Sequence, residues 1–373
     1  MTPLRLLYVV TEDWYFLSHR LPMARAARDA GFEVHVATRV VDGAAAIEAE
    51  GFTLHPVPFV RGRVSPLGTI ATIRALRQVH RTVAPALAHH VALQSAVLGS
   101  IAAWGRPVSG VNALTGLGFA FTSGSGRALL LRPILSMLVR LLFNRPRQTV
   151  LVQNPDDRDG MISLGIAAER IVLIPGSGVD VETLQPLPEP QGPPAVAFVG
   201  RLLADKGIHT LIAAHRRLRQ RGSKVELLIA GTPDPANPAS VSGQEAAAWK
   251  TDPGITMLGH VNDIAGLWAR AHVAVLPSRR EGLPKSLLEA AASGRPMIAA
   301  DVPGCREVVR PGETGLLVPL DDAPALADAI ETLAGSHELR ARYGAAARRL
   351  AVERFSAAAI GRQTVDLYRR LVR

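Results

Sequence analysis

The chain has 373 residues, of which 48% are hydrophobic, and a formal net charge of +10. Because a single hydrophobic core rarely extends over so many residues, this length predicts two domains. Cys305 is the only cysteine, so an internal disulfide is excluded, and no stretch has the uncharged apolar length of a membrane-spanning helix. The composition therefore predicts a soluble chain of a reducing compartment such as the cytoplasm.

The positive charge is concentrated in the first part of the chain. Residues 1–150 carry a net charge of +9, whereas residues 151–373 carry +1. Most of the basic residues are arginines, and many of them would lie on a solvated surface whatever the function. The asymmetry between the two parts nevertheless favours an anionic partner for the first half.

Short apolar runs alternate with longer helical patterns from the start of the chain. The run LRLLYVV predicts a buried strand, PMARAARDA predicts a helix that ends at Gly31, and FEVHVAT predicts the next strand. This is the pattern of a strand–helix–strand unit. It continues with predicted strands at 54–57, 87–91, 148–154 and 170–176, and with predicted helices at 66–83 and 93–103.

The proline-rich segment QPLPEPQGPP at 185–194 predicts a linker, after which the alternation starts again. Residues 231–254 predict a loop insertion. Strands are predicted at 195–200, 225–231, 255–259, 273–277, 296–300 and 315–319, and helices at 206–221, at 284–293 and after about 322. These patterns predict an α/β fold of two doubly wound domains, 1–185 and 193–356, with helix 357–373 as a candidate to pack back on the first domain.

The stretch FVGRLLADKGI contains a candidate anion site. Open parallel sheets bind ligands beyond the carboxyl ends of their strands, and here Arg201 and Lys206 flank the turn that follows a predicted strand. Two cations beside a helix start suit a pair of phosphates. The alternative is two surface cations on an ordinary loop, and this stretch alone does not decide between the two interpretations.

The stretch REGLPKSLLEA places Glu281 and Glu289 eight positions apart around a predicted helix start. Pro284 suits the first helical turn, so the amides of Gly282 and Leu283 could face an anion. Glu281 would accept hydrogen bonds from hydroxyls beside this turn. Glu289 lies on an apolar helix face and needs a partner, such as a ribose diol. The alternative, two solvated helix charges, fits the Gly-Leu-Pro turn less well.

The second half of the chain resembles the family 4 retaining glycosyltransferases. The two glutamates, preceded by Pro277-Ser278 and followed by Ala290, Gly294 and Pro296, are similar to the signature of that family. Four further stretches match it in order: LIPGSGVD, VGRLLADKG, LGHVNDI and DVPGCREVVRPGETGLLVP. NALTGLGFAFTSGSG resembles a bacterial exopolysaccharide and O-antigen subgroup. The resemblance implies a GT-B fold, in which two Rossmann-like domains face each other across a cleft.

The resemblance also implies roles for single residues. Arg201 and Lys206 would hold the donor diphosphate and stabilise the charge of the leaving nucleotide. Glu281 would bind hydroxyls of the donor sugar, and Glu289 would bind the nucleotide ribose. The remaining implied donor contacts come from Gly282, Leu283 and Pro284 near the sugar phosphate and from Gly259 and His260 near the base.

The first half matches the family more loosely. His19 falls where many members have a Ser-His pair beside the cleft, but the preceding glycine-glycine loop is replaced by EDWYFL, so its diphosphate contact is not carried over. His19 is as readily a structural residue as an acceptor contact. LAHHV resembles the histidine motif of the third strand, and neighbours on a strand point opposite ways, so one of His89 and His90 should face the cleft.

Residues 110–116 contain no histidine, so a catalytic histidine is not carried over there. Asn112, Thr115 and Gly116 are candidates for the acceptor-side wall, and simple turn chemistry is the alternative for all three. The arginine-rich segment 126–147 is either a helix packed on the sheet or an amphipathic segment that rests on anionic lipid. Five further arginines could extend the same basic face: Arg61, Arg63, Arg74, Arg77 and Arg81.

No metal or other cofactor is expected. Asp157 and Asp159 form a D-x-D spacing, but they follow Asn154-Pro155 at a predicted helix start, where acids complement the helix dipole. The spacing is therefore interpreted as a helix N-terminus.

The residues and the resemblance together predict a retaining glycosyltransferase, hexosyl- or N-acetylhexosaminyl-, that acts in surface polysaccharide biosynthesis. The donor is a nucleotide-sugar, with UDP favoured over GDP by family frequency, and the acceptor is a lipid-linked glycan. The basic first half would place the enzyme at the inner face of the plasma membrane. Two alternatives remain: a UDP-sugar epimerase of related architecture, which the motif order argues against, and a nucleic-acid binder, which would leave the donor motifs unexplained.

Overall fold

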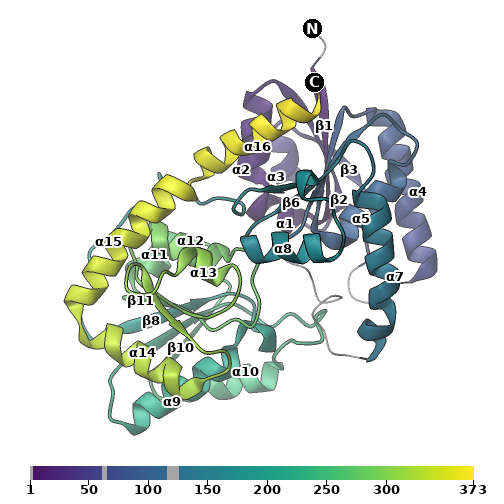
Figure 1. Cartoon of the computed structure of the whole chain (residues 1–373). Helices are drawn as coiled ribbons and strands as arrows, with labels where there is room; N and C mark the ends of the chain where they lie inside the picture. The colour runs from purple at the N-terminus through teal and green to yellow at the C-terminus, as the bar shows by residue number, and fades with distance from the viewer. Residues whose placement is uncertain (1–2, 61–64, 116–125) are drawn as a thin grey trace. The chain divides into compact units, whose positions relative to one another are not determined.

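The computed structural model describes the backbone of residues 3–60, 65–115 and 126–373 and their side chains except those of 126–131 (Figure 1). The chain divides into two units. Unit 1 comprises Met1–Gly178 and Ala357–Arg373, and unit 2 comprises Val179–Ser356. No helix in the described part of the chain is long and apolar enough to cross a membrane.

Unit 1 is built on a parallel sheet of seven strands in the order β3-β2-β1-β4-β5-β6-β7. Successive residues of the central strand point to opposite faces: Leu7 and Val9 pack into one cluster and Leu6 and Tyr8 into another. This is why the strand reads as a continuous apolar run. The strands are β1 (Leu4–Glu12), β2 (Phe32–Arg39), β3 (Thr53–Pro56), β4 (Leu87–Val91), β5 (Ser109–Ala113), β6 (Gln148–Val152) and β7 (Ile171–Leu173).

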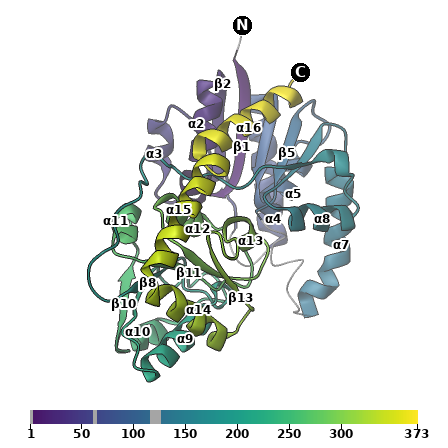
Figure 2. The same cartoon turned by 60° about the vertical axis from the view of Figure 1, so that its left-hand side comes forward.

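Helices cover both faces of this sheet. On one face, α4 (Pro66–Val83) and α7 (Gly126–Phe143) each pack against α5 (Ala92–Ala102). On the other face, α16 (Ala357–Leu371) lies along α2 (Leu21–Asp29), as Figure 2 shows. The other helices in the part of the unit that the structure describes are α1 (Asp13–His19), α3 (Ala44–Ala49), α8 (Pro155–Ser163) and the short 3-10 helix Ala168–Arg170.

Unit 2 is built on a parallel sheet of six strands in the order β10-β9-β8-β11-β12-β13. From β8 the chain moves outward through β9 and β10, and it then returns to the other side of β8 and moves outward again. The order therefore reverses between β8 and β11. The strands are β8 (Ala195–Val199), β9 (Glu226–Ala230), β10 (Ile255–Gly259), β11 (Val273–Leu276), β12 (Met297–Ala300) and β13 (Gly315–Val318).

The helices predicted at 206–221, at 284–293 and after about 322 begin and end close to these positions, whereas four further short helices of unit 2 were not predicted. The expected loop insertion at 231–254 contains a helix, Gly243–Trp249, which starts with a capping box between Ser242 and Glu245 and is anchored by buried Trp249. The unit also contains a short 3-10 helix, Ala204–Lys206. Its α-helices are α9 (Ile208–Gln220), α10 (Gly243–Trp249), α11 (Ile264–Ala269), α12 (Lys285–Ala292), α13 (Cys305–Val308), α14 (Ala323–Gly335) and α15 (His337–Arg354).

The proline-rich segment that was expected to be a linker lies along unit 2. Glu189 pairs with Arg340 of α15 at 2.8 Å. Arg348, on the same helix, donates hydrogen bonds to the backbone carbonyls of Val181 and Leu184. The division between the units therefore falls at residue 178, before the prolines rather than within them.

Candidate functional site

The candidate site of unit 2 lies at the carboxyl ends of β8 and β11. These strands are neighbours, and the strand order reverses between them, which is where open α/β sheets bind ligands. The loops that follow the two strands touch at Gly207. This residue has φ +71°, and a Cβ there would stand 1.9 Å from the carbonyl oxygen of Pro277. Only glycine satisfies both the backbone angle and the close approach.

Hydrogen bonds fix the same two loops to each other. The carbonyl oxygen of Asp205 accepts from the backbone N–H of Arg279 at 2.9 Å and from the hydroxyl of Ser278 at 3.1 Å. Residues that follow one strand are thereby held against residues that follow the other. This fixed backbone positions the charged side chains at the switch point, the place between β8 and β11 where the strand order reverses.

Lys206 and Glu281 form an ion pair across the two loops. The Lys206 Nζ atom lies 2.5 Å from Glu281 Oε1, and the two side chains are 24% and 9% exposed. The structure therefore brings together two predicted donor-site residues from different loops. A cation with a carboxylate beside it can bind a phosphate oxygen and a sugar hydroxyl at neighbouring positions.

Arg201, the other predicted phosphate ligand, is paired with Asp234. The distance from Arg201 Nη1 to Asp234 Oδ2 is 2.7 Å, and the aspartate is largely buried. Asp234 lies in the loop after β9, where its backbone N–H donates to the hydroxyl of Ser240 at 2.8 Å. Sequence reasoning missed Asp234, because an acid in a loop rich in glycine and proline carries no spacing signal.

The turn from Gly282 to Pro284 leads directly into α12. Pro284 is the residue before the helix and has an extended backbone, so α12 begins at Lys285 rather than at Pro284 as predicted. Gly304, which follows β12, packs behind this turn, and a Cβ there would lie 2.4 Å from the carbonyl oxygen of Gly282. Gly282 is buried, and Leu283 is half-buried.

Cys305 is buried directly behind the same turn. Burial, reinforced by the negative charge of Glu281, raises the pKa of its thiol well above the ordinary value. The cysteine is therefore a neutral packing residue at the back of the site.

Glu289 is buried inside α12, one turn after Lys285. Burial raises the pKa of its carboxyl, and the Lys285 ammonium, 3.3 Å from Glu289 Oε1, offsets part of this effect. The prediction that this acid needs a partner holds, but the sequence reasoning overlooked that Lys285 already supplies one at i−4. A diol would therefore meet a carboxylate that is already paired on one side.

Gly259 and His260 lie at the same edge of the sheet but at its far strand, β10. Gly259 has φ +66° and faces open space, and His260 is exposed with its Nε2 atom 3.0 Å from Asn262 Oδ1. The strand order places β9 between β10 and β8. These two residues are thus separated by a strand from the charged centre at Lys206.

The predicted acceptor-side histidines of unit 1 are core residues. His89 and His90 are both 0% exposed. His89 Nδ1 is hydrogen-bonded to the hydroxyl of Tyr368 in α16, and its ring stacks on Tyr8. Burial holds the pKa of His89 well below its usual range and lowers that of His90 to about 4. The expectation that one of them faces a cleft is wrong, because the layers on both faces of the sheet cover β4.

Asn112 is also buried and belongs to a hydrogen-bond network inside unit 1. Its side-chain oxygen accepts from the hydroxyl of Ser100 at 3.0 Å and lies 2.9 Å from His90 Nδ1. Its amide nitrogen donates to Gln148 Oε1 at 3.0 Å. The prediction that Asn112 lines an acceptor wall is therefore wrong, because its polar atoms satisfy neighbours in the core.

The other predicted acceptor residues lie at the ends of elements. His19 is the last residue of α1, where its Nδ1 atom is 2.6 Å from the Ser18 hydroxyl and its ring stacks on Tyr15. Thr115 is half-buried just after β5. Gly116 lies outside the described residues, as do Arg61 and Arg63.

Asp13 anchors the turn that replaces the glycine-glycine loop. Its Oδ2 atom accepts backbone N–H donors from Val41, Asp42 and Gly43 at 2.6, 3.1 and 2.8 Å. Burial alone would raise the pKa of Asp13, but these donors outweigh burial and lower it. Sequence reasoning missed this role, because the three donors lie about thirty residues away.

The D-x-D spacing lies in the first turn of α8. Asn154 caps this helix by accepting from the backbone N–H of Asp157 at 2.8 Å, and its amide donates to Asp157 Oδ2 at 2.9 Å. These contacts agree with its interpretation as a helix N-terminus. No cluster of three histidine, cysteine or acidic side chains that could hold a metal ion occurs among the residues that the structure describes.

Comparison with known proteins gives consistent results for both halves. The model of the glycosyl transferase 4-like family matches residues 5–154, and that of the glycosyl transferases group 1 family matches residues 193–336. The putative glycosyltransferase EpsD of Bacillus subtilis is 28% identical over 98% of this chain and 96% of its own length. An N-acetylgalactosaminyltransferase of Campylobacter jejuni, named for N,N'-diacetylbacillosaminyl-diphospho-undecaprenol, is 24% identical over 96% of this chain and 98% of its own.

A third relative matches only in part. The capsular polysaccharide biosynthesis glycosyltransferase CapM of Staphylococcus aureus is 31% identical over 46% of this chain and 45% of its own length. The alignment thus spans a little under half of CapM.

Two solved structures show the same fold over the whole chain. Sucrose-phosphate synthase from Thermosynechococcus elongatus superposes with a TM-score of 0.81 at 22% identity, covering 98% of this chain and 99% of its own. Anabaena HepE in complex with UDP and glucose gives 0.79 at 19% identity with the same coverage. Together with the two Rossmann-like sheets, these likenesses show that the chain has the GT-B fold. The two family matches and the relatives that match over nearly the whole chain show that it belongs to the family 4 glycosyltransferases.

Proposed function

We propose that the chain transfers a hexose or N-acetylhexosamine from a nucleotide-sugar to a hydroxyl of a lipid-linked glycan, with retention of the anomeric configuration. The observation that carries this proposal is the Lys206–Glu281 ion pair, which lies where the strand order of the unit 2 sheet reverses. Arg201 lies in the same loop as Lys206, and the helix that buries Glu289 follows Glu281. In this arrangement the two cations can bind a diphosphate, and the two carboxylates can accept hydrogen bonds from sugar hydroxyls.

The names of the relatives support the donor and acceptor classes. HepE has been solved with UDP and with UDP-glucose, which favours a UDP-sugar donor. The Campylobacter jejuni relative is named for a diphospho-undecaprenol-linked sugar, and EpsD and CapM are named as glycosyltransferases, the latter of capsular polysaccharide biosynthesis. A lipid-linked acceptor would place this chain at the inner face of the cytoplasmic membrane, in surface polysaccharide biosynthesis.

The proposed chemistry needs no nucleophile from the protein. The bond between the anomeric carbon and the diphosphate breaks, and the nucleoside diphosphate leaves with the electron pair. Arg201 and Lys206 stabilise the charge that develops on it. The acceptor hydroxyl forms the new bond on the same face of the sugar, and a phosphate oxygen of the leaving group takes its proton. Glu281 holds donor-sugar hydroxyls, and Glu289 holds the ribose diol.

Arg201 and Lys206 must each leave a carboxylate partner in order to bind the donor diphosphate. Arg201 is bound to Asp234 and Lys206 to Glu281, so a diphosphate has to compete with these carboxylates. On the acceptor side, His19 and Thr115 remain candidates in the described structure, whereas the buried side chains of His89, His90 and Asn112 do not.

The test compares the binding of nucleotides with the transfer of sugar. UDP, GDP, ADP and their common sugar conjugates are screened by thermal shift, since a ligand of the native state raises the melting temperature by mass action. Transfer is then measured with the matching nucleotide-sugar and a polyprenyl-diphosphate-linked acceptor. Glu281→Gln should retain the nucleotide shift and lose transfer, and the exposed Glu338→Gln should retain both.

Two results would contradict the proposal. Full transfer activity in Glu281→Gln would show that this carboxylate does not hold the donor sugar. A nucleotide-sugar that is epimerised without any acceptor would favour the epimerase alternative.

A further inference from the structure

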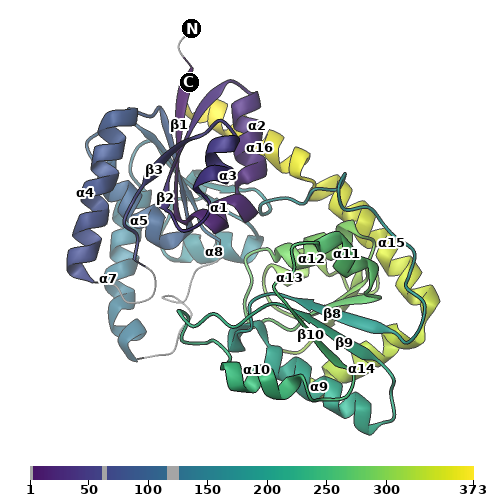
Figure 3. The same cartoon turned by 180° about the vertical axis from the view of Figure 1, so that it is seen from behind.

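The sheet of unit 1 has a strand reversal of its own. From β1 the chain moves outward through β2 and β3, and it then returns to the other side of β1 as β4. Open α/β sheets bind ligands outside the carboxyl ends of their strands at such a reversal. Helix α1 follows β1 directly, so its residues lie at this place, and Figure 3 shows α1 at the edge of the sheet where β1 ends.

The start of α1 is fixed to the neighbouring strand and its loop. Glu12, the last residue of β1, is buried and pairs with Arg39 at the end of β2, with 2.6 Å between Glu12 Oε2 and Arg39 Nη2. One oxygen of Asp13 accepts from the backbone N–H groups of residues 41–43, and the other accepts from the N–H of Trp14 at 2.7 Å. The side chains of α1 can therefore form a preformed surface for a ligand.

Three side chains of α1 form one aromatic cluster. The rings of Tyr15 and His19 stack, with 4.2 Å between their centroids and 4° between their planes. Trp14 packs edge to face with Tyr15, with 5.7 Å between the ring centroids and 77° between the planes. Trp14 is 43% exposed, whereas Tyr15 and His19 are half-buried. The indole of Trp14 is thus the exposed member of a cluster whose other two rings are packed.

An exposed indole on a fixed helix suits the apolar face of a sugar ring. A pyranose has hydroxyls around its rim and a face that consists of C–H groups. These C–H groups carry a slight positive charge, whereas the face of an aromatic ring is negative. A sugar that stacks on Trp14 therefore gains from the buried apolar area and from this attraction, while its hydroxyls stay hydrated.

The charge beside Trp14 favours a neutral ligand over a phosphate. Burial opposes ionisation of Asp13, but its backbone donors outweigh burial and lower the pKa of the carboxyl, so Asp13 is negatively charged at neutral pH. A phosphate next to this carboxylate would be repelled. The hydroxyls and C–H groups of a sugar carry no net charge and meet no such penalty.

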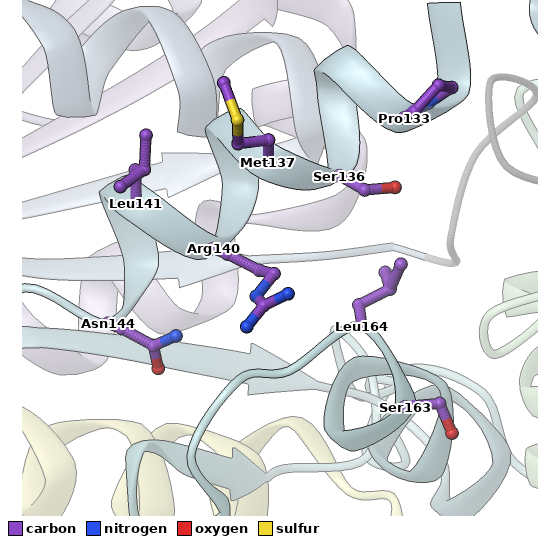
Figure 4. Close-up of a pocket in the computed structure, with 8 residues that line it drawn as sticks. All are labelled: Pro133, Ser136, Met137, Arg140, Leu141, Asn144, Ser163 and Leu164. Atoms are coloured by element: carbon purple, nitrogen blue, oxygen red, sulfur yellow. The ribbon is translucent and has the colours of Figure 1, made fainter.

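A cavity between α7 and the end of α8 offers no comparable surface. Its volume is about 720 Å³, and Figure 4 shows the eight side chains that line it. None of the eight is aromatic, and Arg140 is the charged side chain among them. A sugar in this cavity would find no ring on which to stack.

We propose that Trp14 is the stacking platform for a pyranose ring of the glycan acceptor, and that Tyr15 and His19 position its indole. The proposal rests on the proposed function, because a glycan acceptor is the substrate that supplies such a ring. It gives a role to EDWYFL, the stretch that replaces the glycine-glycine loop. In this chain the stretch contacts a sugar through an aromatic face and makes no contact with a phosphate.

The first test is tryptophan fluorescence of the whole chain. Of its four tryptophans, Trp249 and Trp268 are buried, and Trp104 is 58% exposed. Trp104 lies between α5 and the start of β5, at the opposite edge of the unit 1 sheet from α1. Trp104→Phe therefore leaves Trp14 as the exposed reporter, and Trp14→Phe leaves Trp104 as a matched control.

The probes are the methyl glycosides of glucose, galactose, N-acetylglucosamine and N-acetylgalactosamine. Sorbitol is the ligand control, because it has the hydroxyls of a sugar but no ring face. At least one glycoside should change the emission of the Trp104→Phe protein and saturate in roughly the millimolar range, as expected for one stacked ring. The same glycoside should leave the emission of the Trp14→Phe protein unchanged.

The second test is the kinetics of transfer to the polyprenyl-diphosphate-linked acceptor. Trp14→Ala should raise the KM for the acceptor about tenfold and leave the KM for the nucleotide-sugar unchanged. Trp14→Phe retains an aromatic face and should recover most of this loss. Trp104→Ala removes an exposed tryptophan from the other edge of the sheet and should leave both constants unchanged.

The proposal would be overturned by the absence of a glycoside effect on Trp14, by an equal effect of sorbitol, or by an equal effect on Trp104. An acceptor KM that rises equally in Trp14→Ala and Trp104→Ala would also overturn it. The thermal shift with UDP separates this outcome from failure of the proposed function. A UDP shift without a glycoside effect rejects the platform alone, whereas a glycoside effect on Trp14 without UDP binding or transfer rejects the proposed function.

Discussion

Glu289→Gln should change stability and donor binding in opposite directions. Burial raises the pKa of this carboxyl above its unfolded value, so the folded state favours the neutral form. The stabilisation associated with this shift is complete below the unfolded pKa and is lost as the pH rises through the folded pKa. Ionisation of this carboxyl therefore costs more in the folded state than in the unfolded chain, and Lys285 only partly offsets that cost. The neutral glutamine has a similar shape, so the unliganded variant should melt at a higher temperature.

Donor binding should weaken in the same variant. The proposed diol donates to a charged acceptor, and replacing that acceptor by an amide should remove about 2 to 3 kcal/mol, or roughly 30- to 150-fold in affinity. UDP at about 100 times its wild-type dissociation constant adds about 2.7 kcal/mol of stability, which raises the melting temperature by about 5–10 °C. The same UDP concentration should raise the melting temperature of the variant by only about 1–3 °C.

The assay is a thermal melt at neutral pH with and without UDP, with Glu338→Gln as the control for a surface acid. An unliganded Glu289→Gln protein that melts below the wild type would refute the reasoning about the buried charge. A UDP shift as large as that of the wild type would refute the assignment of Glu289 to the ribose. The two measurements are independent, so each part of the argument can fail alone.

The remaining predictions concern the loops of unit 2 and the core of unit 1. Gly207→Ala should lower the free energy of unfolding of unit 2 by about 2–4 kcal/mol in chemical denaturation, because the added Cβ would clash with the Pro277 carbonyl oxygen. The control is Gly222→Ala, which has a similar φ but open space around the Cβ and should lower the free energy of unfolding by about 1 kcal/mol. Equal losses in the two variants would contradict the role of the Pro277 contact. Asp234→Asn should bind UDP several-fold more tightly in titration calorimetry, since the substitution releases Arg201 from its ion pair. Unchanged or weaker affinity would argue against competition between Asp234 and the diphosphate for Arg201. Unit 1 should lose stability as the pH falls from about 6.5 to 4, because burial holds the pKa of His90 at about 4 while the unfolded chain takes up the proton sooner. Urea midpoints measured across this range should be flatter in His90→Gln, and an identical pH dependence would contradict the assignment.

The sequence was sufficient to predict six of the seven strands of the unit 1 sheet, all six strands of the unit 2 sheet and the donor-side loops, but it missed β5 (Ser109–Ala113). Buried parallel strands appear as short continuous apolar runs, and each is followed by a helical period, so the alternation is visible without contacts. Arg201, Lys206, Glu281 and Glu289 could be chosen because several modest motifs, taken together and in order, resemble the family signature. The ion pair between Lys206 and Glu281 and the close approach of their loops at Gly207 were not predicted from the sequence.

The acceptor side could not be predicted in the same way. A histidine pair on a strand indicates that the two side chains point in opposite directions, but not what covers each face. In the structure, α16 covers one face of β4 and α5 the other, so both His89 and His90 are buried. The helix that supplies Tyr368 lies nearly 280 residues further along the chain, and no local pattern contains that information.

The sequence alone determined the α/β class and the charge asymmetry, since each depends on local periodicity or composition, and its motifs supplied the candidates for the donor site. The tertiary structure decided which polar residues are buried in the core and which lie at the candidate site. It paired Arg201 with Asp234, gave Asp13 its three backbone donors, and buried Asn112 in a network of neutral groups. These assignments depend on which distant segments pack together, and packing over long separations is not encoded in any short stretch of residues.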